Sequence, residues 1–386
     1  MRSTRAVIYL DNLRNNIQSI RRAVKPGTRM CVTVKANAYG HGAVTVAKTV
    51  LACGVEYLAV ATVDEGRELR DGGITAPVLL FSLCTPEEAA DVVACGLTPF
   101  VTDEAYCALF EQAAAAAGVT CTVHLAVDTG MGRIGCMPDQ AADVAAYIQK
   151  CSHLKLGGMC THFAFADNVQ QEGRQYTERQ IAAFTHAVES VRNAGIDPGI
   201  RHCSSSAALL EYPDMQLDMV RPGIIVYGYY PDEVDAAYLA AAGRPLDIRP
   251  VMAFETQVVA VRHFEPGASV SYGRTWTADV PTDIAVLPAG YADGLLRRCS
   301  PGLQVAVNGS AYPVRGRICM DQCMVDIGNG NSRVKRWDKA VIFGPRESGA
   351  LQTADDIARS TGTISYEILT GISRRVPRVY VGELPV

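Results

Sequence analysis

A single lysine follows a short apolar, β-branched run near the start of the chain. The run covers residues 30–34, Lys35 comes directly after it, and Tyr39 lies four residues further on in "VKANAYGHG". A lysine amine held on a rigid element can form a Schiff base with an aldehyde cofactor. Lys35 could instead simply reach solvent at the end of a strand, so the residues that the fold brings beside it have to decide.

Other polar side chains follow later apolar runs at the same kind of position. Arg133 lies in "DTGMGRIG", His162 in "THFAFAD", Ser206 at the end of "SSS", and Arg221 at the start of "RPGIIVYG". If the runs are strands of one barrel, these residues converge on its carboxyl-terminal face, where barrel enzymes build their sites. The last two loops offer hydroxyls and free backbone N–H groups to a phosphate dianion. Together with the lysine, they predict pyridoxal phosphate.

The first 225 residues carry the pattern of the elements that would hold this site. Eight short β-branched runs alternate with amphipathic stretches, which is typical of a (β/α)8 TIM-type barrel of the α/β class. An open doubly wound sheet is the rival, but "KANAYGHG" lacks the glycine fingerprint expected after its first strand. The predicted strands are residues 30–34, 57–61, 78–81, 97–101, 122–127, 156–161, 200–203 and 217–220.

The two ends of the chain add further elements. Asp11 is expected to cap a helix, because the apolar residues Leu13, Ile17 and Ile20 after it follow a 3.6-residue period. After "GRPLDIRP", short alternating runs separated by glycine or proline turns indicate mostly β structure, with one helical insert near "TADDIARSTGTISYEILTGI". We therefore expect two domains, a barrel over residues 1–244 and a mostly β domain over residues 245–386.

The composition limits the classes of function. The 386 residues are 48% hydrophobic, which allows a large core and more than one domain. A net charge of −4 gives no basic surface for nucleic acid. No apolar run reaches the ~20 residues that span a bilayer, and the first one is too short for a secretion signal. We expect a cytoplasmic protein with neither nucleic acid nor membrane as a partner.

The thirteen cysteines favour neither disulfides nor a metal site. Their number is odd, and many lie in apolar runs such as "RMCVTV", where free cysteines act as small hydrophobic residues in a reducing compartment. Cys319 and Cys323 are close in sequence, but no second pair or histidine lies near them to complete a zinc site. We expect no structural metal.

Eight motifs, taken in order, resemble bacterial alanine racemase, and the match covers nearly the whole chain. They are "VKANAYGHG", "VDTGMGRIG", "THFAFAD", "VRPGIIVYG", "VSYGRTW", "GYADG", "GRICMDQ" and "ISYEILTGISRRVPRVY". The resemblance implies a pyridoxal-phosphate barrel of fold type III followed by a β domain. It also implies a head-to-tail homodimer with shared active sites and a small amino acid as substrate.

The same resemblance implies a role for each matched residue. Lys35 looks like the Schiff-base lysine, His162 packs against the cofactor ring, and Arg133 lies near the substrate carboxylate and the cofactor phenol. Arg221 matches the residue facing the pyridine nitrogen. Because an arginine does not give up its proton, that nitrogen stays unprotonated and the ring is a weaker electron sink, which discourages transamination. The positions that match the phosphate site are Tyr39, Ser206, Gly223, Ile224 and Tyr366.

Inversion of a carbon needs a base on each face, and Lys35 can serve only one of them. Tyr272, in "SVSYGRTW", matches the family's second base, which the partner subunit contributes. The ordinary pKa of a phenol, about 10, is too high for a base acting alone. The family's chain of hydrogen bonds through His162 and Arg221 is expected to stabilise the phenolate. The partner-side wall, which limits substrate size and binds its carboxylate, is matched by Tyr291 and Met320.

One position departs from the family pattern. Where the family usually has a lysine modified to a carbamate, "HLAVDTGMGR" has Ala126, whose methyl group carries no charge to orient Arg133. Either a bound anion or another carboxylate does that work, or Arg133 is held more loosely. His41, His124 and His202 are expected to be structural.

Several functions stay open from the sequence alone. The leading one is interconversion of L- and D-alanine, which would supply D-alanine for peptidoglycan in the cell wall. A broader or serine-preferring racemase is a close variant, and a decarboxylase of the same barrel class lacks its own cysteine loop here. A non-catalytic cofactor carrier would share the lysine and the phosphate loops. Such a carrier would lack both the second domain and Tyr272.

Overall fold

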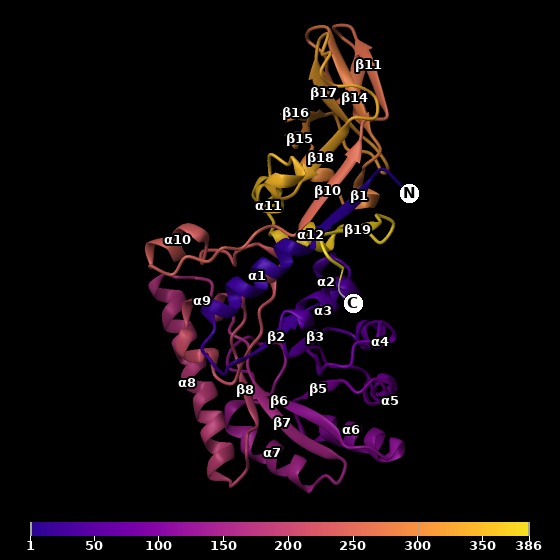
Figure 1. Cartoon of the computed structure of the whole chain (residues 1–386). Coiled ribbons are helices and arrows are strands. Elements are labelled where there is room, and N and C mark those ends of the chain that lie inside the picture. Colours follow the sequence, from indigo (N-terminus) through magenta and orange to yellow (C-terminus); the bar gives the residue numbers. More distant parts are fainter. Residues whose placement is uncertain (1, 301, 385–386) are drawn as a thin grey trace.

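Eight short parallel strands form an almost closed barrel in the computed structural model, which describes residues 2–300 and 302–384 (Figure 1). Their order is β8-β7-β6-β5-β4-β3-β2-β9. Backbone hydrogen bonds bridge β8 and β9, from Asp218 N to Arg201 O (3.2 Å) and from Arg221 N to Ser204 O (2.8 Å). The predicted barrel is confirmed. Its strands are β2 (Arg29–Thr33), β3 (Tyr57–Val60), β4 (Val78–Leu80), β5 (Thr98–Val101), β6 (Cys121–Ala126), β7 (Leu154–Cys160), β8 (Ile200–His202) and β9 (Met219–Val220).

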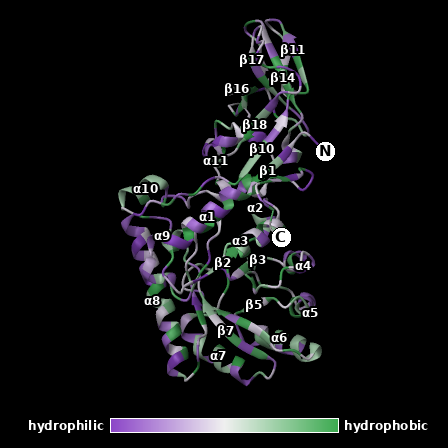
Figure 2. Ribbon diagram, in the orientation of Figure 1, coloured by the Kyte–Doolittle hydropathy of each residue, from purple (hydrophilic) through white to green (hydrophobic). Residues whose placement is uncertain are grey.

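Amphipathic helices follow the strands and cover the barrel. The start of α4 shows how the sequence fixes one of them, because Thr62 and Glu65 form a reciprocal capping box at its first turn. Figure 2 shows both hydrophobic and hydrophilic residues on these helices, as expected when one face packs on the barrel and the other meets water. The helices are α3 (Ala43–Ala52), α4 (Val63–Asp71), α5 (Ala89–Ala94), α6 (Glu104–Ala117), α7 (Ala141–Lys150), α8 (Gln171–Asn193), α9 (Ser206–Glu211) and α10 (Ala236–Ala241).

The chain begins with a strand that the sequence analysis did not predict. This strand, β1 (Arg5–Tyr9), runs directly into helix α1 (Leu10–Ala23), and Tyr9 is the N-cap residue. The expectation that Asp11 caps the helix is therefore wrong. Because the strand leaves no polar linker before the helix, Asp11 lies inside the first turn, where its carboxylate pairs with Arg14 at 2.8 Å.

The second domain is a twisted sheet that extends away from the barrel (Figure 1). Its order is β11-β14-β17-β16-β15-β18-β10-β1-β19, so the first and last strands of the chain lie side by side. The predicted helical insert is present as α11 (Ala354–Thr361) and α12 (Ser365–Thr370). The strands after β1 are β10 (Met252–Gln257), β11 (Ala260–Phe264), β14 (Thr282–Leu287), β15 (Gln304–Val307), β16 (Ser310–Arg315), β17 (Cys323–Gly328), β18 (Lys339–Phe343) and β19 (Arg378–Val381), and β12 (Ser269–Val270) pairs with β13 (Trp276–Thr277) as a separate ribbon.

Strand β1 ties the two parts of the chain together. It pairs antiparallel with β10, where Arg5 lies opposite Glu255, and parallel with β19, where Ala6 lies opposite Arg378. Residues 5–9 thus belong to the sheet of the second domain although they precede the barrel. The division at residue 244 stays a prediction about which segments fold as units.

Two general properties complete the description. No helix within the described part of the chain is long and apolar enough to cross a membrane. The cysteines are all free thiols. Six of them are more than nine-tenths buried in the barrel, namely Cys31, Cys107, Cys121, Cys136, Cys160 and Cys203, and Cys299 and Cys323 are buried in the second domain.

Candidate active site

One cavity of about 630 Å³ opens at the carboxyl ends of the barrel strands. It is lined both by barrel loops and by helix α12 of the second domain, since Tyr366 and Thr370 contribute to its wall. Nine residues that the sequence analysis placed in one site do meet there: Lys35, Tyr39, Arg133, His162, Ser206, Arg221, Gly223, Ile224 and Tyr366.

The segment after Lys35 has a left-handed backbone conformation. Residues 36–39 all have φ between 51° and 56°, in the left-handed region that costs an L-residue roughly 1–2 kcal/mol. Tertiary contacts hold the turn in place: Asn37 Oδ1 accepts the Ala43 backbone N–H at 2.9 Å, and Arg378 donates to the Gly40 carbonyl at 2.8 Å. Strain of this kind persists where the surrounding structure over-determines it, often at functional sites.

The environment of Lys35 favours its neutral amine. Burial lowers the pKa of Lys35 from its ordinary value, the positive charge of Arg133 lowers it further, and Glu65 opposes both effects. A neutral amine is the form that attacks a carbonyl carbon. Glu65 is itself fixed, because its carboxylate accepts backbone N–H groups of Ala36 at 2.6 Å and Ala61 at 2.8 Å. Sequence analysis missed Glu65, which lies in an ordinary helix-start motif.

The far end of the cavity is built from hydroxyls and backbone. Gly223 donates its N–H to Ser206 Oγ at 2.9 Å, and a Cβ at Gly223 would lie only 2.8 Å from the Tyr39 hydroxyl. The Tyr39 ring stacks on Tyr227 with centroids 4.7 Å apart and lies 5.9 Å from the ring of Tyr366. The result is a narrow, hydroxyl-lined recess in which the glycine permits close approach to backbone N–H groups.

Arg221 is a buried cation without a carboxylate partner among the described residues. It is 6% exposed, and its guanidinium donates to the backbone carbonyls of His202 (2.7 Å) and Thr161 (2.7 Å). Its nearest side-chain partner is the ring of His202, with Nη1 at 2.7 Å from Nδ1, whereas Nη2 lies 3.5 Å from Nδ1 of His162. Neutral acceptors therefore hold the whole charge of Arg221 beside the cavity.

The charge of Arg221 fixes the tautomers of two histidines in sequence. A guanidinium can only donate, so Nδ1 of His202 accepts and its proton lies on Nε2. That Nε2 lies 2.7 Å from Nδ1 of His124, which must accept in turn and carry its own proton on Nε2. Burial and Arg221 lower the pKa of His124 to about 3, and the same causes hold that of His202 well below its ordinary value, so both rings are neutral.

This row of contacts crosses the barrel interior. His124 also lines a second cavity, of about 980 Å³, at the amino-terminal mouth. Sequence analysis gave His124 and His202 structural roles, but His202 is the closest side-chain partner of a site residue. The usable signal was their position on the alternate strands β6 and β8, since inward-facing residues of alternate barrel strands share one layer of the interior.

His162 lies at the cavity wall near Arg221, Arg133 and Lys35. Burial lowers its pKa to about 3, with further effects in the same direction from Arg221, Arg133 and Lys35. A neutral imidazole can pack against an aromatic ring or pass a hydrogen bond between two partners. The predicted hydrogen-bonded link from His162 to Arg221 is present only at the long limit of 3.5 Å.

The loop that carries Arg133 is ordered by its own backbone. Asp128 Oδ1 accepts the N–H groups of Gly130 at 2.9 Å and Gly132 at 3.1 Å. Arg133 itself forms no ion pair or hydrogen bond with any residue that the structure describes. Ala126 is 3% exposed and lines the same cavity at the end of β6, so no charged group stands at that position beside Arg133.

Three of the predicted site residues lie outside the cavity within one chain. Tyr272 is 71% exposed, Met320 is 52% exposed and Tyr291 is 42% exposed, all on the second domain. None of them lines the cavity of its own barrel. Their predicted contribution to a partner's site stays a prediction.

Comparison with known proteins adds to this geometry. The chain matches two family models, described as the N-terminal domain of alanine racemase over residues 8–231 and its C-terminal domain over residues 251–380. The chain belongs to the alanine racemase family. That membership makes it an amino-acid racemase and confirms the resemblance seen in the motifs.

Individual alanine racemases are similar to this chain over nearly its full length. An alanine racemase of Treponema denticola is 44% identical over 385 residues, which are 99% of each chain. One of Desulfovibrio desulfuricans is 41% identical over 376 residues, 97% of each chain. The solved alanine racemase of Clostridium difficile 630 superposes with a TM-score of 0.91 at 39% identity, covering 99% of this chain and 96% of that one. The Bacillus anthracis enzyme, solved with bound L-Ala-P, gives 0.90 at 32% identity, covering 99% and 96%.

Proposed function

We propose that the chain interconverts L- and D-alanine with pyridoxal 5'-phosphate as cofactor. The observation that carries the proposal is one cavity in which a lysine of lowered pKa shares its walls with a hydroxyl-lined recess and with a buried arginine, which has no counter-ion among the residues that the structure describes. Each part fits a different part of that cofactor. A carrier protein would also need the recess, but it would have no use for a second domain that closes the cavity.

The residues that line the cavity suit the chemical groups of the cofactor. The recess formed by Tyr39, Ser206 and Gly223 would hold the phosphate, because a Cβ at Gly223 would fill the space that a phosphate oxygen needs. Arg221 would face the ring nitrogen and Lys35 the aldehyde. When bound, pyridoxal phosphate supplies an aldehyde that condenses with amines and a ring that draws electrons from the carbon to be inverted.

The chain's own groups then have distinct tasks. Lys35 would hold the cofactor and would take or return the α-proton on one face of the substrate. Arg133 would orient the substrate carboxylate, and burial, together with the charges of Arg221 and Arg133, keeps the His162 ring neutral. Arg221 keeps its proton, so a cofactor ring nitrogen facing it would stay unprotonated, which would disfavour transamination.

We propose Tyr272 of the partner subunit as the second base, within a homodimer whose subunits complete each other's sites. The side chain of Tyr272 is 71% exposed in a single chain, so it is free to enter the cavity of another subunit and become covered there. Tyr291 and Met320, also exposed, would form the wall that limits substrate size. D-Alanine made in this way would serve peptidoglycan synthesis in the cytoplasm.

Two measurements test the proposal. The purified protein, incubated with L-alanine in deuterated water, should incorporate deuterium at the α-carbon while the optical rotation decays to zero. Replacement Tyr272→Phe should abolish turnover but leave cofactor binding unchanged. A Tyr272→Phe variant that racemises at the rate of the unaltered protein would eliminate the two-base assignment.

Substrate choice needs its own assay. A serine-preferring racemase is the remaining alternative, because Ala126 leaves Arg133 without a charged neighbour on β6. Parallel progress curves with L-alanine and L-serine separate the two functions. A higher kcat/KM for L-serine would replace alanine as the proposed substrate.

A further inference from the structure

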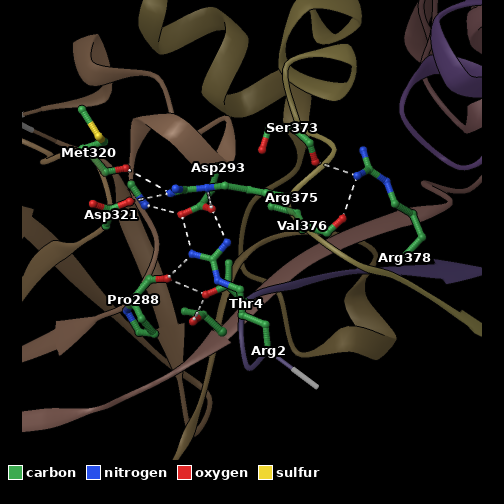
Figure 3. Close-up of polar contacts among 12 residues, drawn as sticks. Arg2, Thr4, Pro288, Asp293, Met320, Asp321, Ser373, Arg375, Val376 and Arg378 are labelled. Atoms are coloured by element: carbon green, nitrogen blue, oxygen red, sulfur yellow. Dashed lines mark hydrogen bonds and ion pairs between the residues drawn. The ribbon is translucent and has the colours of Figure 1, made fainter.

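A fully buried carboxylate joins the two ends of the chain in the second domain. Asp293 is 0% exposed, and it closes the short 3-10 turn η6 (Tyr291–Asp293). Arg2 binds it through Nη1 and Oδ1 at 2.5 Å and through Nη2 and Oδ2 at 3.0 Å, and Arg375 donates from Nε to Oδ1 at 2.6 Å. Figure 3 shows both guanidinium groups converging on this one carboxylate.

The carboxylate lies at the junction of two loops. Its Oδ2 accepts the Gly290 N–H at 3.0 Å, while Tyr291 N donates to Cys319 O and Ala292 N to Met320 O, each at 3.0 Å. A Cβ at Gly290 would lie 2.3 Å from the Met320 carbonyl, so the two loops touch through bare backbone. The backbones that carry Tyr291 and Met320 are therefore one unit.

The arginines extend the same unit on both sides. Arg375 Nη2 pairs with Asp321 Oδ1 at 2.9 Å and reaches the Met320 carbonyl at 3.4 Å (Figure 3). Arg2 Nη2 donates to the Pro288 carbonyl at 3.2 Å, and Thr4 also donates to that carbonyl. We call Arg2, Asp293 and Arg375 the Asp293 clamp.

The charge of Asp293 is essential to the clamp. Burial raises the pKa of Asp293, but hydrogen bonds from Arg2, Arg375 and Gly290 outweigh it and hold the pKa below its ordinary value. Bidentate and charge-assisted contacts of this kind fix orientation more sharply than neutral ones. An amide in place of the carboxylate would keep the size of the side chain but would remove the charge of Asp293 from two partly exposed guanidinium groups, whose side chains are 32% (Arg2) and 40% (Arg375) exposed.

We infer that Asp293 is a positioning residue for substrate selection: it sets the backbone from which Tyr291 and Met320 point into the partner's cavity. The inference rests on the proposed function, in which those two side chains form the wall around the substrate. The clamp does not touch the barrel recess, so it acts on substrate size and carboxylate binding and leaves cofactor affinity alone.

The test compares Asp293→Asn with Glu255→Gln. Glu255 is the matched control, because it is also a buried carboxylate (4% exposed) of the second domain bound by two cations, Arg5 at 2.7 Å and Lys339 at 3.6 Å, but it touches neither loop. Both variants should melt at lower temperature than the unaltered protein. Only Asp293→Asn should raise the KM for alanine about tenfold or more with a smaller change in kcat. Only this variant should also lower the ratio of kcat/KM for alanine to kcat/KM for 2-aminobutyrate.

Cofactor titration supplies the readout that does not depend on turnover. Both variants should bind pyridoxal phosphate with the affinity of the unaltered protein, measured at concentrations where each has the same sedimentation coefficient. Equal KM values and equal selectivity in the two variants would overturn the inference. If Asp293→Asn does not fold, Arg2→Met leaves Asp293 paired with Arg375 and should show the same selectivity change in weaker form, and its absence would count equally against the clamp.

The result that would refute the proposed function differs from the result that would refute the role of the Asp293 clamp. In that case the unaltered protein itself would not racemise alanine, whatever the variants do. A racemising unaltered protein with a selective Asp293→Asn variant supports both claims, and a racemising protein with an indifferent variant removes only the clamp.

Discussion

Replacement of His202 by leucine tests how a buried arginine is held without a counter-ion. Leucine has a similar volume, so the cavity left behind is small, but it removes the Nδ1 acceptor that Arg221 reaches at 2.7 Å. It also removes the Nε2 donor to His124 at 2.7 Å. Arg221 keeps its bonds to the backbone carbonyls of residues 161 and 202, so its orientation is weakened without being lost.

The size of the effect follows from these two bonds. A hydrogen bond to a charged group contributes about 1.5–3 kcal/mol and a neutral one about 0.5–1.5 kcal/mol, so the barrel should lose roughly 2–4.5 kcal/mol. With a urea dependence of about 3 kcal/mol per molar for a domain of this size, the unfolding midpoint should fall by roughly 0.7–1.5 M. His202→Asn is the matched control, because its amide oxygen can take the place of Nδ1. It should lose only the contribution of the neutral bond to His124.

The assay has to report on the barrel alone. Both tryptophans, Trp276 and Trp337, lie in the second domain, so their fluorescence follows that domain, whereas far-ultraviolet circular dichroism follows the helices that cover the barrel. The circular-dichroism midpoint of His202→Leu should fall and that of the tryptophan signal should not. Equal midpoints for the leucine and asparagine variants would refute the view that Nδ1 is an acceptor that Arg221 needs.

Two further predictions concern the recess and the acid stability of the barrel. Gly223→Ala places a methyl group 2.8 Å from the Tyr39 hydroxyl, so affinity for pyridoxal phosphate should fall about tenfold or more in a cofactor titration while the circular-dichroism spectrum stays the same, and unchanged affinity would argue against a phosphate there. Burial lowers the pKa of His124 to about 3 in the folded chain, from an ordinary 6.5 in the unfolded one. Between these pH values the unfolded state binds more protons, so the free energy of unfolding falls as the pH drops below 6.5. His124→Gln should therefore flatten that fall by up to ~1.4 kcal/mol per pH unit in urea titrations at pH 7, 6 and 5, and an equally steep fall would show that the ring is protonated in the folded chain.

The sequence contained most of the fold because local patterns and global topology agree. The eight β-branched runs lie within a few residues of the strands that form, since a parallel barrel buries both faces of each strand and leaves near-continuous apolar runs. Strand β1 was missed because its partners, β10 and β19, come some 250 and 370 residues later. No local period reveals a pairing of that range.

The residues of the site also fall into those that the sequence could predict and those that it could not. Lys35, Arg221 and Ser206 could be predicted to converge, because the ends of barrel strands must meet on one face. The row from Arg221 through His202 to His124 could not, since it depends on which side chains face inward at one level of the barrel. Asp293 gave no signal as an anchor, because its arginine partners come from opposite ends of the sequence.

The position of β1 has a consequence for how the protein is made. This strand leaves the ribosome before either of its neighbours, since β10 follows some 250 residues later and β19 some 370 residues later. Its apolar residues 6–8 stay unpaired until β10 is made, and the pairing with β19 can form only after residue 381. Completion of the sheet around β1 is therefore a late step, whereas the barrel that encloses Lys35 has all its strands by residue 220 and can assemble during translation.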